Sequence, residues 1–240
     1  MTKRNLILSG GFGHDFADTS ATIAELLVAL DVESEIVEPP NWNHHMRRLD
    51  GVDLLTINAL RWSMSAPRYE HDREEYAYAT SLPFKMGIEA HLAAGRGILC
   101  MHTACICFDD WPLWSEILGA AWDWNRSFHP EYGDRVEVHD TLRRERFPIA
   151  DEVYHALRTR SGRDVIGTAA VPRGTPPQHA PLVGDARTGG AQAVLWRRHH
   201  GQGRVVVDTL GHDSESLRNP KHFHMLSGAV EWALSHQIMA

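Results

Sequence analysis

The sequence predicts an α/β fold in which helices cover both faces of a central, mostly parallel β-sheet. Three observations predict it. Short apolar segments, of the kind buried on both faces of a parallel sheet, alternate with helical segments along the first hundred residues. The length of 240 residues suits one sizeable domain, and 43% hydrophobic with 23% charged residues is ordinary globular composition. We find no repeat and no second core in the sequence, so we expect residues 1–240 to form a single domain.

The first half of the chain alternates clearly between strand and helix patterns. Continuous apolar runs that end at glycine or proline indicate buried strands. Residues 18–30 place apolar side chains at a period of 3.6 after Asp18 or Thr19, either of which can cap a helix. The elements predicted here are strands at 5–9, 35–37, 52–57 and 97–101 and helices at 18–30 and within 70–94.

The second half is less regular, although its end is clear. Pro220 suits the first turn of a helix at 220–235, which follows an apolar strand (GRVVVDTL). We interpret residues 143–146 as a solvated turn and the Pro/Gly-rich residues 172–190 as a mobile loop. The elements predicted here are helices at 109–118 and 220–235 and strands at 135–139, 165–171, 192–196 and 203–210.

Charge, hydropathy and cysteine content exclude several classes of protein. The chain has 24 Lys and Arg against 31 Asp and Glu, a formal net charge of −7, so we expect no nucleic-acid partner. Its longest uncharged apolar run, residues 97–108, is shorter than the roughly 18 residues that a membrane span needs, so we expect no membrane partner. The 3 cysteines all lie between residues 100 and 107 and cannot form a disulfide framework, which predicts a reducing, cytoplasmic location.

Nucleotide-binding and common hydrolase motifs do not occur in the sequence. The turn SGGFGH after the first predicted strand lacks the lysine of a P-loop and the full spacing of a dinucleotide-binding turn, so we expect no nucleotide cofactor. HExxH, CxxC and GxSxG motifs are absent. The adjacent pairs His44-His45 and His199-His200 would point their rings to opposite sides of a strand, and we interpret them as surface residues.

Of the 16 histidines, His14, His102 and His212 lie where an open parallel sheet binds its ligands, just beyond the carboxyl ends of predicted strands. We expect at least two of these three to line one site. The alternative is that each is a surface histidine at a turn. His102 carries the most weight, because a buried strand that runs directly into a small-residue turn is typical of a nucleophile elbow. The nearby cysteines are interpreted as buried packing residues.

Aromatic residues gather in the middle of the chain, near histidine and aspartate. Core packing explains such a cluster, and so does a site for sugar rings, because aromatic faces stack on the apolar faces of sugars. The cluster consists of Trp111, Trp114, Trp122, Trp124 and Phe128.

Several segments together resemble the ThuA-like (trehalose utilisation) family, which adopts a flavodoxin-like, class I glutamine amidotransferase-like fold. The most specific segment is the run WRRHHGQGRVVVDTLGHD at 196–213, followed by a helix that contains Glu-Trp-Ala at 231–233. One departure is TLRRER at 141–146, where the family usually has His-Pro-Ile-Thr before its Asp-Glu stretch. The other matching segments are 7–11 with His14, 97–102 and 147–154.

The resemblance implies a role in sugar utilisation but not glutaminase chemistry. Glutamine amidotransferases carry a cysteine at the elbow, where this chain has His102. The sequence FHPE at 128–131 imitates their His-Pro-Glu motif, but the place of that motif after the last strand is held by residues 211–213. An elbow histidine, His212 and Glu152 suit proton transfer on a keto-sugar: removal of a proton next to the carbonyl and protonation of a leaving glycosidic oxygen. The predicted catalytic residues are His102, Glu152, His212 and Asp213, and the predicted substrate contacts are His14, Trp111, His129 and Tyr154.

The same histidines suit a divalent metal. Neutral imidazoles from His14, His102 and His212, or from two of them, would hold zinc, manganese, cobalt or nickel with a position open for substrate. Asp213 would then orient a ring, and Glu152 would act as a base or as a further ligand. The alternative is a hydrogen-bonded histidine cluster around water.

Two functions from different classes remain open. The first is an enzyme that acts on a keto-sugar or glycoside by hydrolysis, elimination or isomerisation. The second is a non-catalytic carbohydrate-binding or regulatory protein on a degenerate amidotransferase fold. Ionisable groups that converge on the strand ends favour the enzyme, because a sugar-binding protein would rely more on amides and aromatic rings. A small carbohydrate is the expected partner, and the formation of a homo-oligomer is left open.

Overall fold

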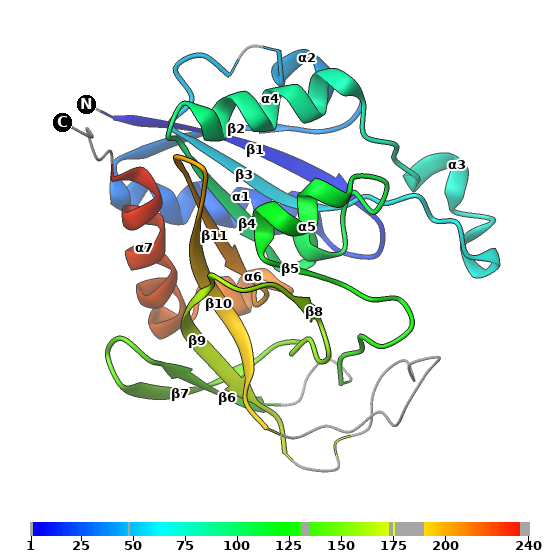
Figure 1. Cartoon of the computed structure of the whole chain (residues 1–240). Helices are drawn as coiled ribbons and strands as arrows, with labels where there is room; N and C mark the ends of the chain where they lie inside the picture. The colour runs from blue at the N-terminus through cyan, green and yellow to red at the C-terminus, as the bar shows by residue number, and fades with distance from the viewer. Residues whose placement is uncertain (1, 48, 131–134, 173–174, 176–189, 236–240) are drawn as a thin grey trace.

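Within the described part of the chain, nine strands form one sheet (Figure 1). The computed structural model describes residues 2–47, 49–130, 135–172, 175 and 190–235. In order across the sheet, the strands are β2 (Val32–Val37), β1 (Lys3–Gly11), β3 (Leu54–Leu60), β4 (Gly97–Met101), β11 (Gly203–Asp208), β10 (Gln192–His200), β9 (Asp164–Ala170), β6 (Arg135–Asp140) and β7 (Glu145–Ala150). The short strands β5 (Ala120–Ala121) and β8 (Arg158–Thr159) pair with each other.

The first five strands in this order are parallel. They pair as β2-β1-β3-β4-β11, which is the flavodoxin-like order 2-1-3-4-5 with β11 in the fifth place. The prediction that strands near 5–9, 52–57, 97–101 and 203–209 are neighbours is therefore confirmed. The other half of the sheet is antiparallel. Only residues 201–202 separate β10 from β11, and a parallel pair would need a crossover of about a dozen residues or more.

Helices cover both faces of the parallel half, as the sequence predicts. Alternate strand residues point to the two faces: in β3, Leu55 packs toward one helical layer and Leu54 toward the other. Burial on both faces explains why these strands are continuous apolar runs in the sequence. The covering helices are α1 (Phe16–Leu27) and α7 (Pro220–Leu234) on one face, and α4 (Leu82–Ala93) and α5 (Pro112–Leu118) on the other (Figure 1).

Two predictions about helices in the first half are corrected. α1 begins before Asp18, because the carboxylate of Asp15 accepts the backbone N–H of Asp18 and caps the helix. The region predicted as helical within 70–94 contains the short helix α3 (Arg73–Tyr76) and then α4. α4 begins only after Ser81, whose hydroxyl caps it.

The hairpin of β6 and β7 was only half predicted. β6 agrees with the predicted strand at 135–139, but the segment 143–146, interpreted as a turn, includes the start of β7. Because β7 is an edge strand, it alternates buried Phe147 and Ile149 with outward-facing residues and lacks a continuous apolar run. After β7, residues 151–154 contact the turns that follow β4 and β11. The loop predicted at 172–190 lies almost entirely outside the described residues.

Short helical segments complete the described fold. His44 and His45 lie on a helix and not on a strand; His44 is exposed and His45 is half-buried. Among the described residues, no helix combines the length and the apolar character that crossing a bilayer requires. The remaining short segments are α2 (Trp42–His45), α6 (Ser214–Leu217) and the 3-10 turns η1 (Val28–Leu30), η2 (Pro67–Tyr69) and η3 (His102–Cys105).

Candidate active site

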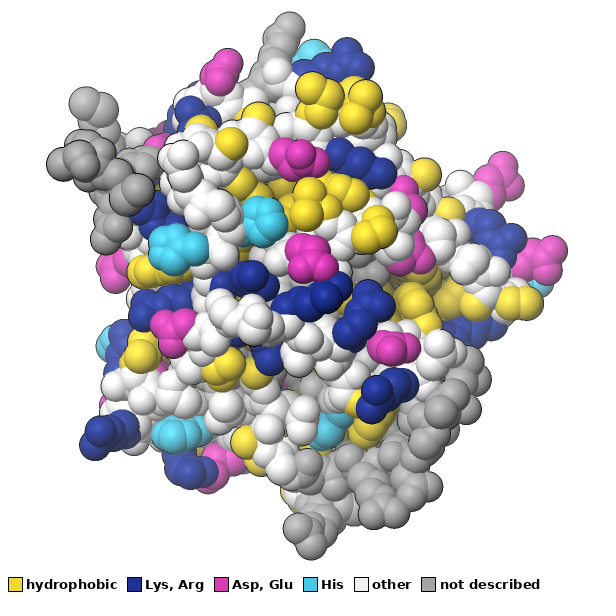
Figure 2. All heavy atoms as spheres, in the orientation of Figure 1, with side chains coloured by type: hydrophobic (Ala, Val, Ile, Leu, Met, Phe, Trp, Pro, Cys, Tyr) yellow, Lys and Arg dark blue, Asp and Glu magenta, His cyan; other side chains and the backbone are white. Residues whose placement is uncertain are grey.

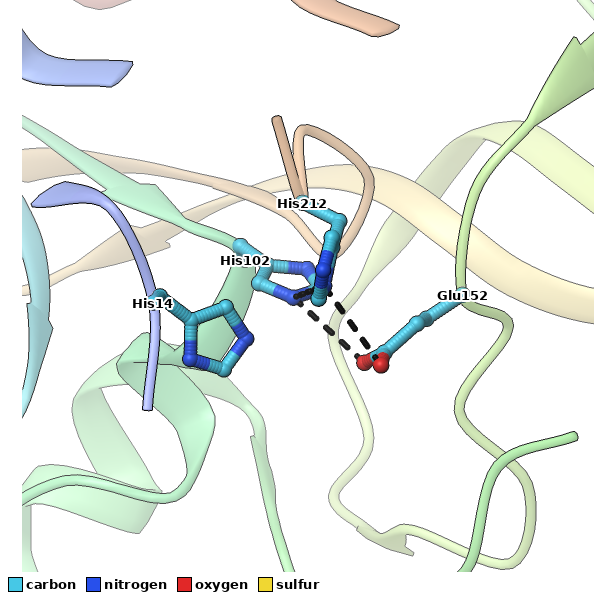
Figure 3. A group of neighbouring side chains, drawn as sticks. All are labelled: His14, His102, Glu152 and His212. Carbon is cyan, nitrogen blue, oxygen red and sulfur yellow. Dashed lines mark hydrogen bonds and ion pairs between the residues drawn. The ribbon is translucent and has the colours of Figure 1, made fainter. Parts of the chain in front are cut away.

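Four ionisable side chains meet beyond the carboxyl ends of the parallel strands (Figure 3). His14 follows β1, His102 follows β4 and His212 follows β11, whereas Glu152 comes from the loop after β7. One nitrogen of each imidazole and one oxygen of the carboxylate all lie within 4.8 Å of one another. The strands that carry the histidines are close neighbours in the sheet, so their loops open onto the same edge. We call these four residues the histidine centre.

His102 stands at a strained turn between β4 and η3. Its φ is 40°, a left-handed conformation that is costly for a residue with a Cβ, and elbow turns of this kind present one side chain at the top of a sheet. The ring is buried, and its Nδ1 donates a hydrogen bond to the carbonyl oxygen of Thr209 at 2.9 Å. That bond places a proton on Nδ1 and turns Nε2 toward the other three groups.

His14 presents an uncharged nitrogen to the centre. Its Nδ1 donates to the carbonyl oxygen of Phe12 at 3.3 Å, so Nε2 carries no proton in the neutral ring. This Nε2 is buried and has no hydrogen-bond partner in the described part of the chain. Burial, and then the neighbouring His102 and His212, lower the pKa of His14 to about 3. At neutral pH His14 can therefore serve as a metal ligand or as an acceptor, but not as an acid.

Glu152 links the histidines electrostatically. Its carboxylate oxygens lie 3.5 Å from Nε2 of His102, 3.4 Å from Nδ1 of His212 and 3.4 Å from Nδ1 of His129. Burial alone would raise the pKa of Glu152, but the hydrogen bonds from His102 and His212 outweigh it and hold the pKa far below its usual range. Burial alone would lower the pKa of His102, but the hydrogen bond and charge of Glu152 raise it. The carboxylate therefore stabilises the protonated form of the His102 ring that faces it.

Tyr154 borders the centre from the same loop as Glu152. Its hydroxyl lies 3.3 Å from Nε2 of His102, and burial raises the pKa of Tyr154 well above its ordinary value. The hydroxyl therefore stays protonated and can donate a hydrogen bond. The rings of His129 and Trp122 lie beside that of Tyr154, with ring centroids 5.9 Å and 5.2 Å away. Together these rings form an aromatic wall next to the four ionisable groups.

Asp151 holds the turn that carries His212. It is buried and accepts hydrogen bonds from the backbone N–H of Gly211 at 2.7 Å and of His212 at 3.4 Å. It also accepts the hydroxyl of Ser216 at the start of α6. Because Asp151 precedes Glu152 directly, one loop supplies a carboxylate to the centre and fixes the turn that brings His212 to it.

Six of the eight predicted site residues come together in one cluster. Asp213, predicted to orient a ring, is the N-cap of α6, and its carboxylate accepts the backbone N–H of Ser216 at 2.8 Å. Trp111, predicted to contact substrate, is buried beside α5 and stacks on Trp114 with ring centroids 6.0 Å apart. The six that meet are His14, His102, His129, Glu152, Tyr154 and His212.

Asp151 and Thr209 were missed by the sequence analysis. A signal for Asp151 was present, because it and Glu152 are adjacent acids after a strand. Adjacent side chains of an extended chain face opposite ways, so one can face the centre while the other faces the turn behind it. Thr209 acts through its backbone carbonyl, which no side-chain pattern marks.

The fold and the centre together define an α/β protein of glutamine amidotransferase-like fold whose elbow carries a histidine in place of cysteine. A glutamine amidotransferase from Thermotoga maritima matches with a TM-score of 0.53 at 10% identity, over 98% of this chain and 100% of that chain. A ThuA-like protein from Parabacteroides merdae matches with a TM-score of 0.71 at 14% identity, over 100% of this chain and 92% of that chain. A ThuA-like protein from Bacteroides uniformis matches with a TM-score of 0.66 at 14% identity, over 99% of this chain and 93% of that chain.

The chain belongs to the ThuA family, described as trehalose utilisation, because the model of that family matches residues 4–233. Membership links the protein to carbohydrate utilisation and confirms the resemblance seen in the sequence. The structural matches, at 10% to 14% identity, show the fold alone. No curated protein matches the sequence significantly.

Proposed function

We propose that the protein is an enzyme that acts on a keto-sugar or glycoside, by proton transfer between the substrate and the histidine centre. The observation that carries the proposal is the convergence of three imidazoles and one carboxylate at the strand ends. A site that only bound sugar would have little use for a buried, ionised glutamate beside three histidines, because burying charged groups costs free energy unless they are paired or used. Family membership supplies the carbohydrate context.

His102 and Glu152 are the pair proposed to move protons. Glu152 raises the pKa of His102 and so favours the form of the ion-free imidazole that carries a proton on Nε2. That proton can pass to a leaving glycosidic oxygen. Glu152 stays ionised and can take a proton from the carbon next to a carbonyl. The Tyr154 hydroxyl, 3.3 Å from Nε2 of His102, can donate to a substrate oxygen in the same place.

The residues present also fit a divalent transition metal. His14 Nε2 is a buried lone pair without a partner, and the Nδ1–H of His102 donates to a carbonyl oxygen, as ligand histidines usually do. His14, His102, His212 and Glu152 would hold the ion. When bound, such an ion would polarise the carbonyl group of a keto-sugar. Ion binding competes with the proton on His102, because both need Nε2.

The test is incubation of protein purified without a histidine tag with 3-keto-trehalose and with methyl 3-keto-glucoside, followed by NMR and mass spectrometry. We expect a free sugar or an isomer from wild type and none from His102→Ala. The matched control is His44→Ala, an exposed histidine away from the centre, which should keep wild-type turnover. Saturable calorimetric binding without any chemical change would overturn the enzyme and favour the non-catalytic carbohydrate-binding protein.

Elemental analysis of the same preparations tests the metal. A stoichiometry near one that falls in His102→Ala and His212→Ala, but not in His44→Ala, supports the metal. A metal-to-protein stoichiometry near zero, with turnover unaffected by a chelator, would contradict the metal proposal. The histidines would then act as proton-transfer groups.

A further inference from the structure

A concave feature distinct from the histidine centre lies beyond the carboxyl end of β3, where the chain continues to Trp62. It is a recess of about 270 Å³ whose surface is mainly apolar, and Figure 2 shows hydrophobic side chains exposed there, between the α3 segment and the loop after β5. Its walls are the rings of Trp62, Tyr69 and Trp124, and residues 65–68 close one side. We call this feature the aromatic recess. Nothing in the proton chemistry above uses it.

Phe12 and Trp122 connect the aromatic recess with the histidine centre. The ring of Phe12, two residues before His14, lies 5.9 Å from the ring centroids of both Trp62 and Tyr69. On the other side, the Trp122 ring lies 6.2 Å from that of Trp124 and 5.2 Å from that of Tyr154, which contacts His102. A ligand that spans the recess and the centre would therefore run along a continuous row of rings.

The aromatic recess is held in shape by the protein itself. The guanidinium of Arg73 donates hydrogen bonds to the carbonyl oxygens of three successive residues, 64–66. The carboxylate of Asp109 accepts both the backbone N–H and the hydroxyl of Ser63, next to Trp62. Trp62 is 3% exposed and stacks on Trp124 with an interplanar angle of 29°. Rigid walls reduce the entropic cost of binding a ligand.

We propose that the aromatic recess binds the second pyranose ring of a disaccharide substrate, the ring that leaves when the glycosidic bond breaks. This inference rests on the proposed function. A pyranose presents an apolar C–H face to aromatic rings and hydroxyl groups at its rim. The recess offers the matching surfaces, because its walls are aromatic and Arg68 and Ser65 lie at its side as hydrogen-bonding groups.

Size and charge support one ring as the occupant. A volume of about 270 Å³ is near the lower end for ligand sites, so it suits one ring and not a whole disaccharide. The other ring would lie at the histidine centre. The guanidinium of Arg68 lies over the Tyr69 ring, 4.8 Å from its centroid, and over the Trp124 ring at 5.8 Å, so a hydrogen-bond donor lies on the aromatic faces themselves.

The experiment compares two substrates in the full-length protein. Trp124→Ala should raise KM for 3-keto-trehalose about tenfold, because one stacking face is lost, and leave KM for methyl 3-keto-glucoside unchanged. Trp124→Phe, which keeps an aromatic face, should restore most of the disaccharide KM. The matched control is Trp232→Ala, which removes a half-buried tryptophan from α7 and should change neither value. Equal changes for both substrates, or no change for the disaccharide, would overturn the proposal.

A binding measurement separates this proposal from the proposed function. Unoxidised trehalose is titrated calorimetrically into wild type, Trp124→Ala and Trp232→Ala. If no keto-sugar is turned over but trehalose binding is weakened only in Trp124→Ala, the proposed enzymatic activity is overturned. The proposal that the aromatic recess binds a sugar ring is then supported. If keto-sugars are turned over but Trp124→Ala binds and turns over the disaccharide like wild type, the recess alone is overturned.

Discussion

His102 with Glu152 and His222 with Asp208 are both buried pairs of a histidine and a carboxylate. Hydrogen bonds of Asp151 and Ser216 lie between the two pairs. His222 on α7 lies 2.8 Å from the Asp208 carboxylate at the end of β11, and both side chains are 0% exposed. His102 lies 3.5 Å from Glu152. Each pair joins one histidine to one carboxylate, yet only His102 and Glu152 belong to the histidine centre.

The difference lies in the second nitrogen of each ring. His222 uses both nitrogens inside the protein, because Nδ1 donates to the carbonyl oxygen of Ser216 at 2.9 Å and Nε2 bonds to Asp208. Burial alone would lower the pKa of His222, but the charge and hydrogen bond of Asp208 raise it to about 9. His102 uses Nδ1 inside the protein and leaves Nε2 facing several groups at longer distances. A histidine whose two nitrogens both have close partners in the protein stabilises the fold. A histidine with one nitrogen left at longer distances is available to a substrate or an ion.

The largest expected effect is on turnover, from His102→Ala. Loss of a group that transfers protons should lower kcat for the keto-sugar about 10²- to 10⁴-fold. Circular dichroism should show a folded protein, because His129 and His212 still lie beside the Glu152 carboxylate when the His102 ring is lost. A His102→Ala variant with wild-type kcat would show that His102 transfers no proton in the rate-limiting step.

The structural pair should respond in the opposite way. Asp208→Asn leaves the buried His222 without its counter-charge and should lower the free energy of unfolding by about 3 kcal/mol in urea titrations. Metal content, measured under native conditions, should stay unchanged. Glu25→Gln, which breaks the exposed ion pair with Arg218, is the control and should have little effect on unfolding. Equal losses in the two variants would contradict the stabilising role of the buried pair.

The stability of the wild type should also depend on pH through His222. Its folded pKa of about 9 lies above the ordinary value of 6.5, so its stabilising contribution is complete below pH 6.5. The contribution is then lost as the pH rises through 9, by about 3 kcal/mol in total. Urea titrations from pH 6 to 9.5 should show this decline in wild type and a flatter curve in Asp208→Asn. If the free energy of unfolding fell with pH equally in wild type and Asp208→Asn, the titration of His222 would not be the cause of the decline.

The smallest expected effect comes from Asp151→Asn, which lies between the two pairs. The amide cannot accept all of the hydrogen bonds that the carboxylate receives from Gly211, His212 and Ser216, so His212 should be held less firmly. Loss of such a supporting group typically costs about 10- to 100-fold in metal affinity or activity. A fall in metal affinity with an unchanged circular dichroism spectrum would identify Asp151 as a positioning residue. Unchanged affinity and turnover would argue against that role.

The parallel half of the fold could be predicted because its strands are buried on both faces. A strand such as 97–101 must be apolar at every position, and a continuous apolar run is visible in any single sequence. β7 was missed because an edge strand alternates and even contains Pro148. The prediction of a single helical region within 70–94 was wrong for a local reason, because Ser81 caps a new helix inside it.

The amino-acid sequence by itself determined which side chains stand at strand ends, because a strand and the turn after it are local patterns. His14, His102 and His212 follow from that rule alone. Only the tertiary structure decided that their nitrogens converge with Glu152 within 4.8 Å, and that Asp213 caps a helix. It also decided that His222, which no local pattern distinguishes, is saturated by Ser216 and Asp208. The physical reason is that a hydrogen-bond partner across the fold is set by packing, and packing joins residues that are far apart in the chain.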